Sequence, residues 1–200
     1  MEIVRLVVLD SELAFRHKNW LLQRVNDQQK EKALRYKNEI DQVRSLASSY
    51  LMNGLSKEPL LFNDTGKPFF KDGPFFNVSH SGKYIVMVVS NKEIGVDIEE
   101  NIEKDMSSLN RIFNEAESKL LKRHTDFYYL WCAKESLIKC MGSSINKIKE
   151  IPSLPLNGIK TFKGKDYYSQ TFILDKHIIS ITRESNEEFE IKTERIEHLL

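Results

Sequence analysis

The chain presents helical patterns followed by strand patterns twice, and its two halves end in similar segments. Residues 83–88 (Lys-Tyr-Ile-Val-Met-Val) resemble residues 176–181 (Lys-His-Ile-Ile-Ser-Ile), and another strand pattern follows each at a similar spacing. Such a repeat indicates two related structural units. The sequence therefore predicts an α+β fold of two pseudo-duplicated lobes, each an antiparallel sheet with packed helices. We expect the lobes at residues 1–102 and 103–200, with a cleft between them.

The expected elements follow from periodicity, caps and turn residues. Ser11 is the expected N-cap of the first helix, and Gly142 is the expected stop of the last. A short turn at residues 91–93 predicts a hairpin of the strands on either side, and the last two strands are expected to form a matching hairpin. The expected helices span about 11–25, 27–36, 39–53 and 126–141, and the expected strands span 3–9, 75–79, 84–90, 94–99, 159–163, 167–174, 177–183 and 188–194.

Composition argues against several classes of function. The net charge is +1, so no general field attracts nucleic acid or a membrane surface. No apolar run approaches the ~18 residues that a membrane span requires, and the N-terminus has no basic leader. Cys132 and Cys140 lie in one expected helix, ~12 Å apart, beyond the ~7 Å limit for a disulfide. We therefore expect buried free thiols in a cytoplasmic protein.

Three acidic residues and one lysine carry the strongest chemical signal. Asp97 and Glu99 are two residues apart, so on a strand both carboxylates face the same way. Glu135 and Lys139 are four apart, so they share one face of a helix. Together they predict a site for a divalent cation beside a bound phosphate. Ordinary alternatives stay open: two solvent-facing strand acids, and a surface ion pair worth ~0.3–0.5 kcal/mol.

A polar turn and several scattered bases provide weaker signals. Ser79 and His80 follow a strand pattern, and their backbone and side chains suit an anion-binding turn or a simple polar turn. A Ser-His-Asp triad with Asp97 is disfavoured, because adjacent residues on a strand face opposite ways. Lys67 lies in a loop beside Pro68, and the other bases taken singly are typical of a solvated surface.

In chain order, these stretches together resemble the Sfp-type 4'-phosphopantetheinyl transferases. No single stretch is specific, but the ordered set and its spacing are. The matching stretches are residues 66–68 (Gly-Lys-Pro), 76–82 (Phe-Asn-Val-Ser-His-Ser-Gly), 94–99 (Ile-Gly-Val-Asp-Ile-Glu), 113–117 (Phe-Asn-Glu-Ala-Glu), 131–136 (Trp-Cys-Ala-Lys-Glu-Ser) and Lys139.

The resemblance implies an enzyme that transfers the 4'-phosphopantetheine arm of coenzyme A to a serine of an apo acyl or peptidyl carrier protein. It implies Mg²⁺, with Mn²⁺ as an alternative, and release of adenosine 3',5'-bisphosphate. By resemblance, Asp97, Glu99 and Glu135 hold the metal, Glu135 takes the serine proton, and Lys139 contacts the phosphate beside the scissile bond. The implied catalytic residues are Glu135, Lys139 and Asp97, and the implied coenzyme A contacts are Lys32, Arg44, Lys67, Ser79, His80 and Lys139.

The chain also departs from the family pattern. Gln29 stands where a relative has a base, with Lys30 as a substitute, and Glu117 occupies an acidic position of uncertain role. Two alternatives stay open: a metal-dependent phosphohydrolase acting on coenzyme A-like pyrophosphates, and a non-catalytic binder of coenzyme A or of a carrier protein. We expect a monomer, because one chain supplies both sides of the cleft. The carrier and its pathway, whether fatty acid, polyketide or nonribosomal peptide synthesis, are not specified.

Overall fold

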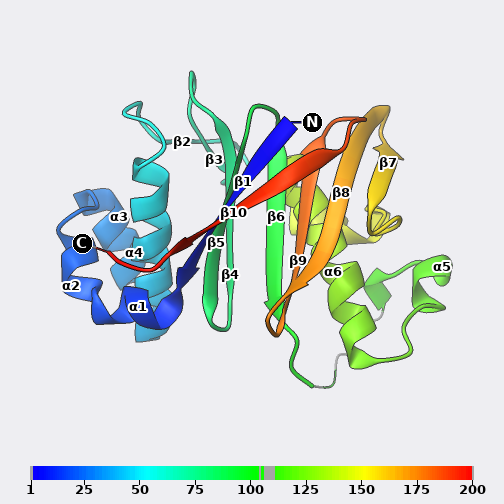
Figure 1. The fold of residues 1–200 in the computed structure, drawn as a ribbon, viewed down its shortest axis with the longest axis horizontal. Helices are drawn as coiled ribbons and strands as arrows, with labels where there is room; N and C mark the ends of the chain where they lie inside the picture. Colours follow the sequence, from blue (N-terminus) through cyan, green and yellow to red (C-terminus); the bar gives the residue numbers. More distant parts are fainter. Residues whose placement is uncertain (1, 104, 106–110, 200) are drawn as a thin grey trace.

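The computed structural model describes residues 2–103, 105 and 111–199, and it shows a mixed α+β architecture (Figure 1). The helices are α1 (Ser11–Arg16), α2 (Lys18–Leu22), α3 (Asp27–Leu34), α4 (Glu39–Asn53), α5 (Glu115–Ser118), α6 (His124–Cys140) and the 3-10 helix η2 (Ile145–Glu150). The strands are β1 (Glu2–Asp10), β2 (Leu61–Phe62), β3 (Pro68–Phe69), β4 (Phe75–Ser81), β5 (Tyr84–Ser90), β6 (Ile94–Glu100), β7 (Gly158–Phe162), β8 (Lys165–Leu174), β9 (His177–Glu184) and β10 (Phe189–Ile196).

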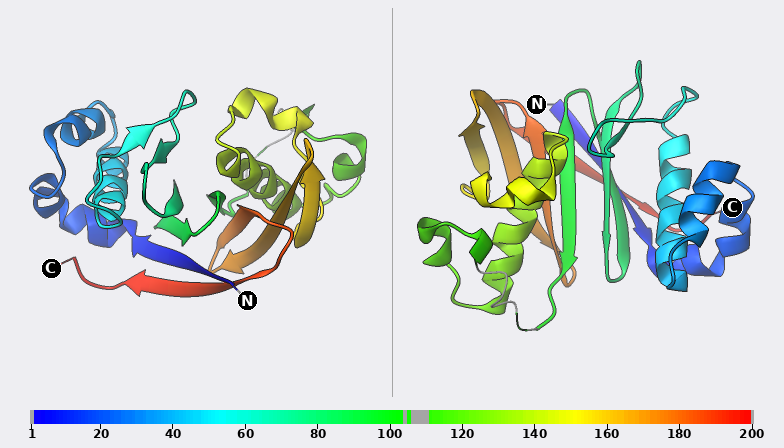
Figure 2. Two further views of the ribbon diagram at one scale, coloured as in Figure 1. Left: turned by 90° about the horizontal axis from the view of Figure 1, so that it is seen from above. Right: turned by 180° about the vertical axis from the view of Figure 1, so that it is seen from behind.

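Two four-stranded sheets form the centre of the molecule. Their strand orders are β10-β1-β5-β4 and β6-β9-β8-β7, and β2 and β3 make a small separate ladder. Among the described residues, every pairing is antiparallel except that of β1 with β10, which run parallel and side by side across the molecule (Figures 1 and 2). The prediction of an α+β fold with antiparallel sheets and packed helices is therefore confirmed for the second sheet, whereas the parallel pair of β1 and β10 makes the first sheet mixed.

Both predicted hairpins are wrong. The neighbours of β5 are β1 and β4, and β4 and β5 are joined by a two-residue turn in which Gly82 has a φ of 49°. With both edges of β5 filled, β6 passes to the second sheet and pairs with β9. Likewise, β10 leaves β9 and pairs with β1 in the first sheet. For β6 and β10, the strand partner is thus set by long-range packing rather than by sequence proximity.

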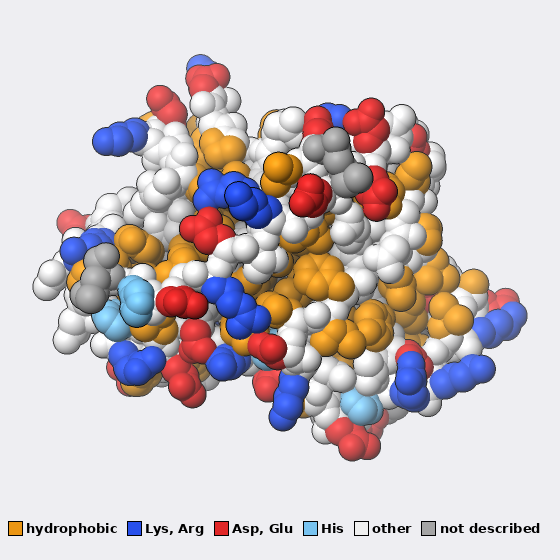
Figure 3. All heavy atoms as spheres, viewed as in Figure 1, with side chains coloured by type: hydrophobic (Ala, Val, Ile, Leu, Met, Phe, Trp, Pro, Cys, Tyr) orange, Lys and Arg blue, Asp and Glu red, His pale blue; other side chains and the backbone are white. Residues whose placement is uncertain are grey.

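Three hydrophobic clusters explain why the central strands are almost continuously apolar. On β1, Val7 and Leu9 face the core beneath α1–α4, whereas Val4, Leu6 and Val8 face a core shared by the two sheets. A third core lies between α6 and strands of the second sheet. The groups of helices therefore lie at opposite ends of the molecule, with the sheets between them (Figure 2). Acidic and basic side chains are interspersed around the face in Figure 3, as the small net charge suggests.

The predicted helices are confirmed, except that the first of them is divided into α1 and α2. The helix expected over 11–25 is split at His17, whose φ of −106° and ψ of 20° are not helical, and Asp10 rather than Ser11 caps α1. Gly142, with a φ of 58°, follows the end of α6. Both cysteines are free and buried. Within the described part of the chain, no helix has the length and apolar character needed to cross a membrane.

Candidate active site

The acidic strand and the central helix approach each other closely because β6 carries a glycine. The apolar residues of β6 face the core between the sheets, so Gly95, Asp97 and Glu99 face the opposite way. A Cβ atom on Gly95 would lie 2.1 Å from the carbonyl oxygen of Ser136 and 2.3 Å from the backbone nitrogen of Cys140. Glycine therefore allows α6 to lie directly against the strand that bears Asp97.

Asp97, Glu135 and Lys139 lie together where β6 meets α6. The Nζ atom of Lys139 donates to Oδ1 of Asp97 at 2.6 Å and lies 3.4 Å from Oε2 of Glu135. Asp97 is almost fully buried, whereas the side chains of Glu135 and Lys139 are 18% and 27% exposed. A ligand can therefore reach the lysine and the glutamate from solvent, with the aspartate behind them.

Side chains of β4 join this cluster from the first sheet, in what we call the β4–β6 seam (Asn77, Ser79 and Ser81 of β4 with residues 96–100 of β6). The Ser79 hydroxyl donates to Oδ1 of Asp97 at 3.0 Å and accepts from Lys139 at 3.1 Å. The Ser81 hydroxyl donates to Oε2 of Glu99 at 2.9 Å. The Asn77 side chain accepts the backbone N–H of Val96 at 3.0 Å. Both sheets thus contribute to one polar site.

Glu135 and Lys139 respond differently to burial. Burial and the charge of Asp97 raise the pKa of Glu135 to about 7, against the opposing influence of Lys139. Burial alone would lower the pKa of Lys139, but the charges of Asp97 and Glu135 outweigh it and hold that pKa above its ordinary value. The lysine is therefore a permanent positive charge, and the glutamate is poised to exchange a proton near neutral pH.

The donor set fits a divalent cation, although the side chains are not arranged around one. Over the described residues, no three His, Cys, Asp or Glu side chains are grouped to hold a metal ion. Lys139 instead contacts both Asp97 and Glu135. Yet Oδ2 of Asp97 is buried without a hydrogen-bond partner among those residues. Asp97 and Glu135 also share one ammonium, Glu99 lies two residues from Asp97 on the same face of β6, and carboxylate oxygens are ligands that Mg²⁺ prefers. The assignment of Asp97, Glu99 and Glu135 as metal ligands stays a prediction.

A second polar feature, the β4–α4 pocket (lined by Lys32, Ser45, Ser48 and His80 among others), lies between α3, α4 and β4. Its volume is about 210 Å³. Arg44 lies nearby and donates to the carbonyl oxygen of Gly82 at 2.6 Å. The surrounding protein, followed by the charges of Arg44 and Lys139, lowers the pKa of His80. Lys32 and Arg44 therefore supply the positive charge at this pocket, although Arg44 also pairs with the pocket residue Asp41 at 3.2 Å, and the imidazole of His80 is held toward its neutral form.

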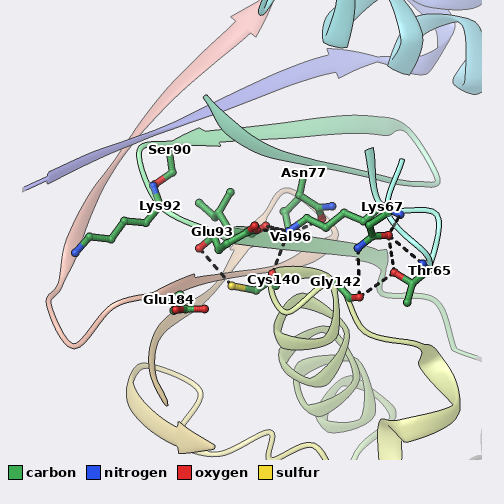
Figure 4. Close-up of polar contacts among 12 residues, drawn as sticks. Thr65, Lys67, Asn77, Ser90, Lys92, Glu93, Val96, Cys140, Gly142 and Glu184 are labelled. Atoms are coloured by element: carbon green, nitrogen blue, oxygen red, sulfur yellow. Dashed lines mark hydrogen bonds and ion pairs between the residues drawn. The ribbon is translucent and has the colours of Figure 1, made fainter. Parts of the chain in front are cut away.

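Of the residues predicted to contact coenzyme A, Lys32 and His80 line this pocket, Arg44 lies beside it and Lys139 contacts Asp97, whereas the remaining two, Ser79 and Lys67, have other surroundings. Ser79 faces Asp97 in the β4–β6 seam, because it alternates along β4 with the pocket residue His80. The Nζ atom of Lys67 donates to Oε2 of Glu93 at 2.6 Å and to the carbonyl oxygen of Cys140 at 3.0 Å (Figure 4). Lys67 thus ties its loop to the end of α6.

Glu117 and Lys134 form a buried ion pair that the sequence did not predict. Oε2 of Glu117 lies 3.0 Å from Nζ of Lys134, and Oε1 accepts from the backbone and hydroxyl of Ser153 at 2.8 and 2.6 Å. Lys134 also donates to the carbonyl oxygen of Ile148 at 3.3 Å. A signal was present, because a lysine in a predominantly apolar helix needs a partner. The pair belongs to the core of the second half.

Gln29, which stands where a relative of the family has a base, and its neighbour Lys30 both make contacts within the fold. The side chain of Gln29 completes the capping box of α3 with Asn26 and bonds Asn53 at 2.9 Å. The neighbouring Lys30 pairs with Asp27 at 2.9 Å. Lys32 is therefore the α3 base that lines the β4–α4 pocket.

Comparisons with known proteins agree with this arrangement. Residues 93–192 match the model of the 4'-phosphopantetheinyl transferase superfamily. A 4'-phosphopantetheinyl transferase of Bacillus subtilis is 30% identical over 188 residues, which are 86% of this chain and 81% of that protein. Sfp of Bacillus subtilis strain 168 is 28% identical over 188 residues, which are again 86% of this chain and 81% of that protein. The gsp protein of Aneurinibacillus migulanus is 32% identical over 142 residues, which are 64% of this chain and 60% of that protein. The chain therefore belongs to this superfamily, as an Sfp-type 4'-phosphopantetheinyl transferase.

Proposed function

We propose that the chain transfers the 4'-phosphopantetheine arm of coenzyme A to a serine of an apo acyl or peptidyl carrier protein, and releases adenosine 3',5'-bisphosphate. The observation that carries this proposal is the contact of Lys139 with both Asp97 and Glu135, at a site that solvent reaches. Neighbouring acids and a fixed base suit phosphoryl transfer, in which positioning and electrostatic stabilisation dominate.

Coenzyme A is expected to span the two polar features. Lys32 and Arg44 supply positive charge for a phosphate of the nucleotide in or beside the β4–α4 pocket, and the neutral imidazole of His80 can donate a hydrogen bond to it. The pyrophosphate then meets the ammonium of Lys139 in the β4–β6 seam. Asp97, Glu99 and Glu135 are the residues that would hold Mg²⁺, or Mn²⁺, and the ion would supply stabilisation of negative charge on the leaving phosphate.

The chain's own residues account for the remaining chemistry. The serine hydroxyl of the carrier attacks the phosphorus that bears the pantetheine arm, and the bond from that phosphorus to the bridging oxygen breaks. Glu135 receives the serine proton, and its pKa of about 7 suits a base that works near neutral pH. Lys139 stabilises the charge that develops on the transferring phosphoryl group. Ser79 holds Asp97 and Lys139 in register through its two hydrogen bonds.

The finer architecture is also a proposal. We infer two duplicated lobes divided near residue 102, with the site in the cleft between them. Support comes from the reciprocal exchange of strands, since β6 and β10 each follow a similar strand, β5 or β9, and each joins the other sheet. A single chain that supplies both sides of the site suits a monomer. The free cysteines suit a reducing, cytoplasmic location.

Incubation with coenzyme A, MgCl₂ and an apo carrier protein tests the proposal. Intact-protein mass spectrometry should show one phosphopantetheine added per carrier, with an equal amount of adenosine 3',5'-bisphosphate, and a carrier whose target serine is replaced by alanine should stay unmodified. Free phosphopantetheine with unlabelled carrier would instead identify a hydrolase. A stable complex without chemistry would identify a binder.

A further inference from the structure

Five buried hydroxyl groups form a connected cluster between α6 and the second sheet. The Oγ atom of Ser136 on α6 lies 3.0 Å from Oγ of Ser180 and 2.8 Å from Oγ1 of Thr182, both on β9. Two hydroxyls of β8 extend the cluster, Thr171 to Ser180 at 3.0 Å and Ser169 to Thr182 at 2.9 Å. Every member is buried. Directional bonds therefore cross the boundary between the helix and the sheet.

The cluster connects the two elements that carry the acidic residues. Across the β6–β9 ladder, Ser180 is the direct partner of Asp97, and Thr182 is the direct partner of Gly95. Opposite residues of an antiparallel pair project to the same face, so the two β9 hydroxyls lie beside the strand that bears Asp97. On the helix, Ser136 directly follows Glu135. The helix is thus bonded to the sheet next to both carboxylates.

At the interface between α6 and the second sheet, hydroxyl groups give a directional restraint that apolar contacts do not give. Most of the buried α6 side chains that face the second sheet are apolar, and apolar burial is not directional, so it restrains sliding or rotation of the helix weakly. A hydrogen bond weakens steeply once its geometry is lost, so bonds from Ser136 to two β9 residues select one position. The close approach at Gly95 leaves room only for small side chains. Small hydroxyl residues meet both requirements.

We propose that Ser136, Ser180 and Thr182 are positioning residues, which hold α6 on the sheet so that Glu135 and Lys139 are aligned with Asp97 for phosphoryl transfer. The inference rests on the proposed function. A misplacement of about 1 Å at a catalytic group lowers rates by up to ~100-fold. The hydroxyls therefore control turnover without touching the substrate.

The decisive variant is Ser180→Ala combined with Thr182→Val, which removes both β9 partners of Ser136 while keeping side-chain shapes similar. Its matched control is Ser169→Ala, which removes a buried hydroxyl of the same cluster that contacts β9 but not α6. A second control, Thr182→Ser, keeps the hydroxyl. We expect kcat to fall about 10- to 100-fold in the double variant, with the KM for coenzyme A changed less than about threefold. Both controls should keep kcat near that of the unmodified protein.

A second readout does not depend on turnover. Mn²⁺ is titrated into each protein in the presence of coenzyme A, and free Mn²⁺ is followed by electron paramagnetic resonance. The double variant should bind Mn²⁺ at least several-fold more weakly than Ser169→Ala. Equal kcat and equal Mn²⁺ affinity in these two variants would overturn the inference. If the unmodified protein binds Mn²⁺ but labels no carrier, the proposed function fails, and the Mn²⁺ titration still tests the positioning role.

Discussion

Helix α6 carries two lysines that each meet acidic residues, and their surroundings are opposite. Lys134 and its partner Glu117 are 0% and 1% exposed, and the carboxylate of Glu117 is saturated by backbone and hydroxyl donors. Lys139 is 27% exposed, and its partner Asp97 keeps one oxygen without a hydrogen bond among the described residues. Complete satisfaction is typical of a structural ion pair, whereas an unsatisfied and accessible cluster has capacity left for a ligand.

The pKa directions of the two acids follow the same division. Burial would raise the pKa of Glu117, but bonds from Ser153 and Asn114 outweigh it and hold that pKa below its ordinary value. Burial and the charge of Asp97 raise the pKa of Glu135 to about 7. The fold therefore stabilises the anion of Glu117, whereas the influence of Lys139 on Glu135 is outweighed by burial and by the charge of Asp97. Variants of the two clusters should accordingly affect different properties.

The largest expected effect on stability is that of Glu117→Gln. This change leaves Lys134 buried without its counter-charge, which typically costs about 3–5 kcal/mol. Urea denaturation should therefore show a large fall in the free energy of unfolding, while the transfer rate per folded molecule stays unchanged. In the double variant Glu117→Gln/Lys134→Met both charges are absent, so much of the stability should return. A fall in turnover without a fall in stability would place Glu117 in the reaction.

The corresponding change in the other cluster is Glu135→Gln. It removes the proposed base and a proposed metal ligand, so carrier labelling should fall at least ~100-fold, or about 2.7 kcal/mol of transition-state stabilisation. The free energy of unfolding should stay level or rise, because the variant removes a partly buried carboxylate whose charged form is disfavoured by burial and by Asp97 more than Lys139 favours it. Glu115→Gln is the control, since Glu115 is an exposed acid that pairs with Lys119. Undiminished labelling by Glu135→Gln would remove the proposed role.

Gly95→Ala tests whether both the stability of the fold and the rate of turnover depend on the position of α6. The added methyl group would lie 2.1 Å from the Ser136 carbonyl oxygen, so the helix must shift away from β6. Overpacking of this kind typically costs 1–3 kcal/mol, and the displaced carboxylates should lower turnover about 10- to 100-fold. Gly54→Ala is the matched control, because its Cβ atom would approach Leu51 no closer than 3.4 Å. Wild-type turnover in Gly95→Ala would show that the site tolerates movement of the helix.

The sequence predicted the elements of the two clusters better than their contacts. Apolar periodicity located β6 and α6 to within two residues, because periodicity is a local property. The pairing of β6 with β9 was missed, since it joins strands about eighty residues apart and depends on which sheet edges are free. Spacing showed that Glu135 and Lys139 share a helix face. It could not show that Lys139 also contacts Asp97, or that Ser79 and His80 serve different polar features.

A third lysine, Lys160 on β7, differs from both Lys134 and Lys139. Its side-chain nitrogen is buried and has no hydrogen-bond partner in the described part of the chain. Burial lowers its pKa to about 7, with Glu117 opposing the shift and Lys134 adding to it. Between pH 7 and its ordinary value of 10.5, the unfolded chain binds this proton and the folded chain does not. Stability should therefore rise with pH across that window, by at most about 1.4 kcal/mol per pH unit.

Lys160→Met isolates this contribution, because other groups titrate equally in both proteins. The variant should be more stable than the unmodified chain at pH 7, since it carries no buried unpaired ammonium. The stability difference between the two proteins should shrink as the pH rises toward 9. Over this range the unmodified protein becomes more stable, because its unfolded state binds a proton at Lys160 that its folded state does not, and this advantage of the unfolded state falls as protons become scarcer. Urea denaturation of both proteins at pH 7, 8 and 9 measures the difference. A constant difference would mean that Lys160 keeps its proton in the folded state, and Glu117 would then serve two lysines rather than one.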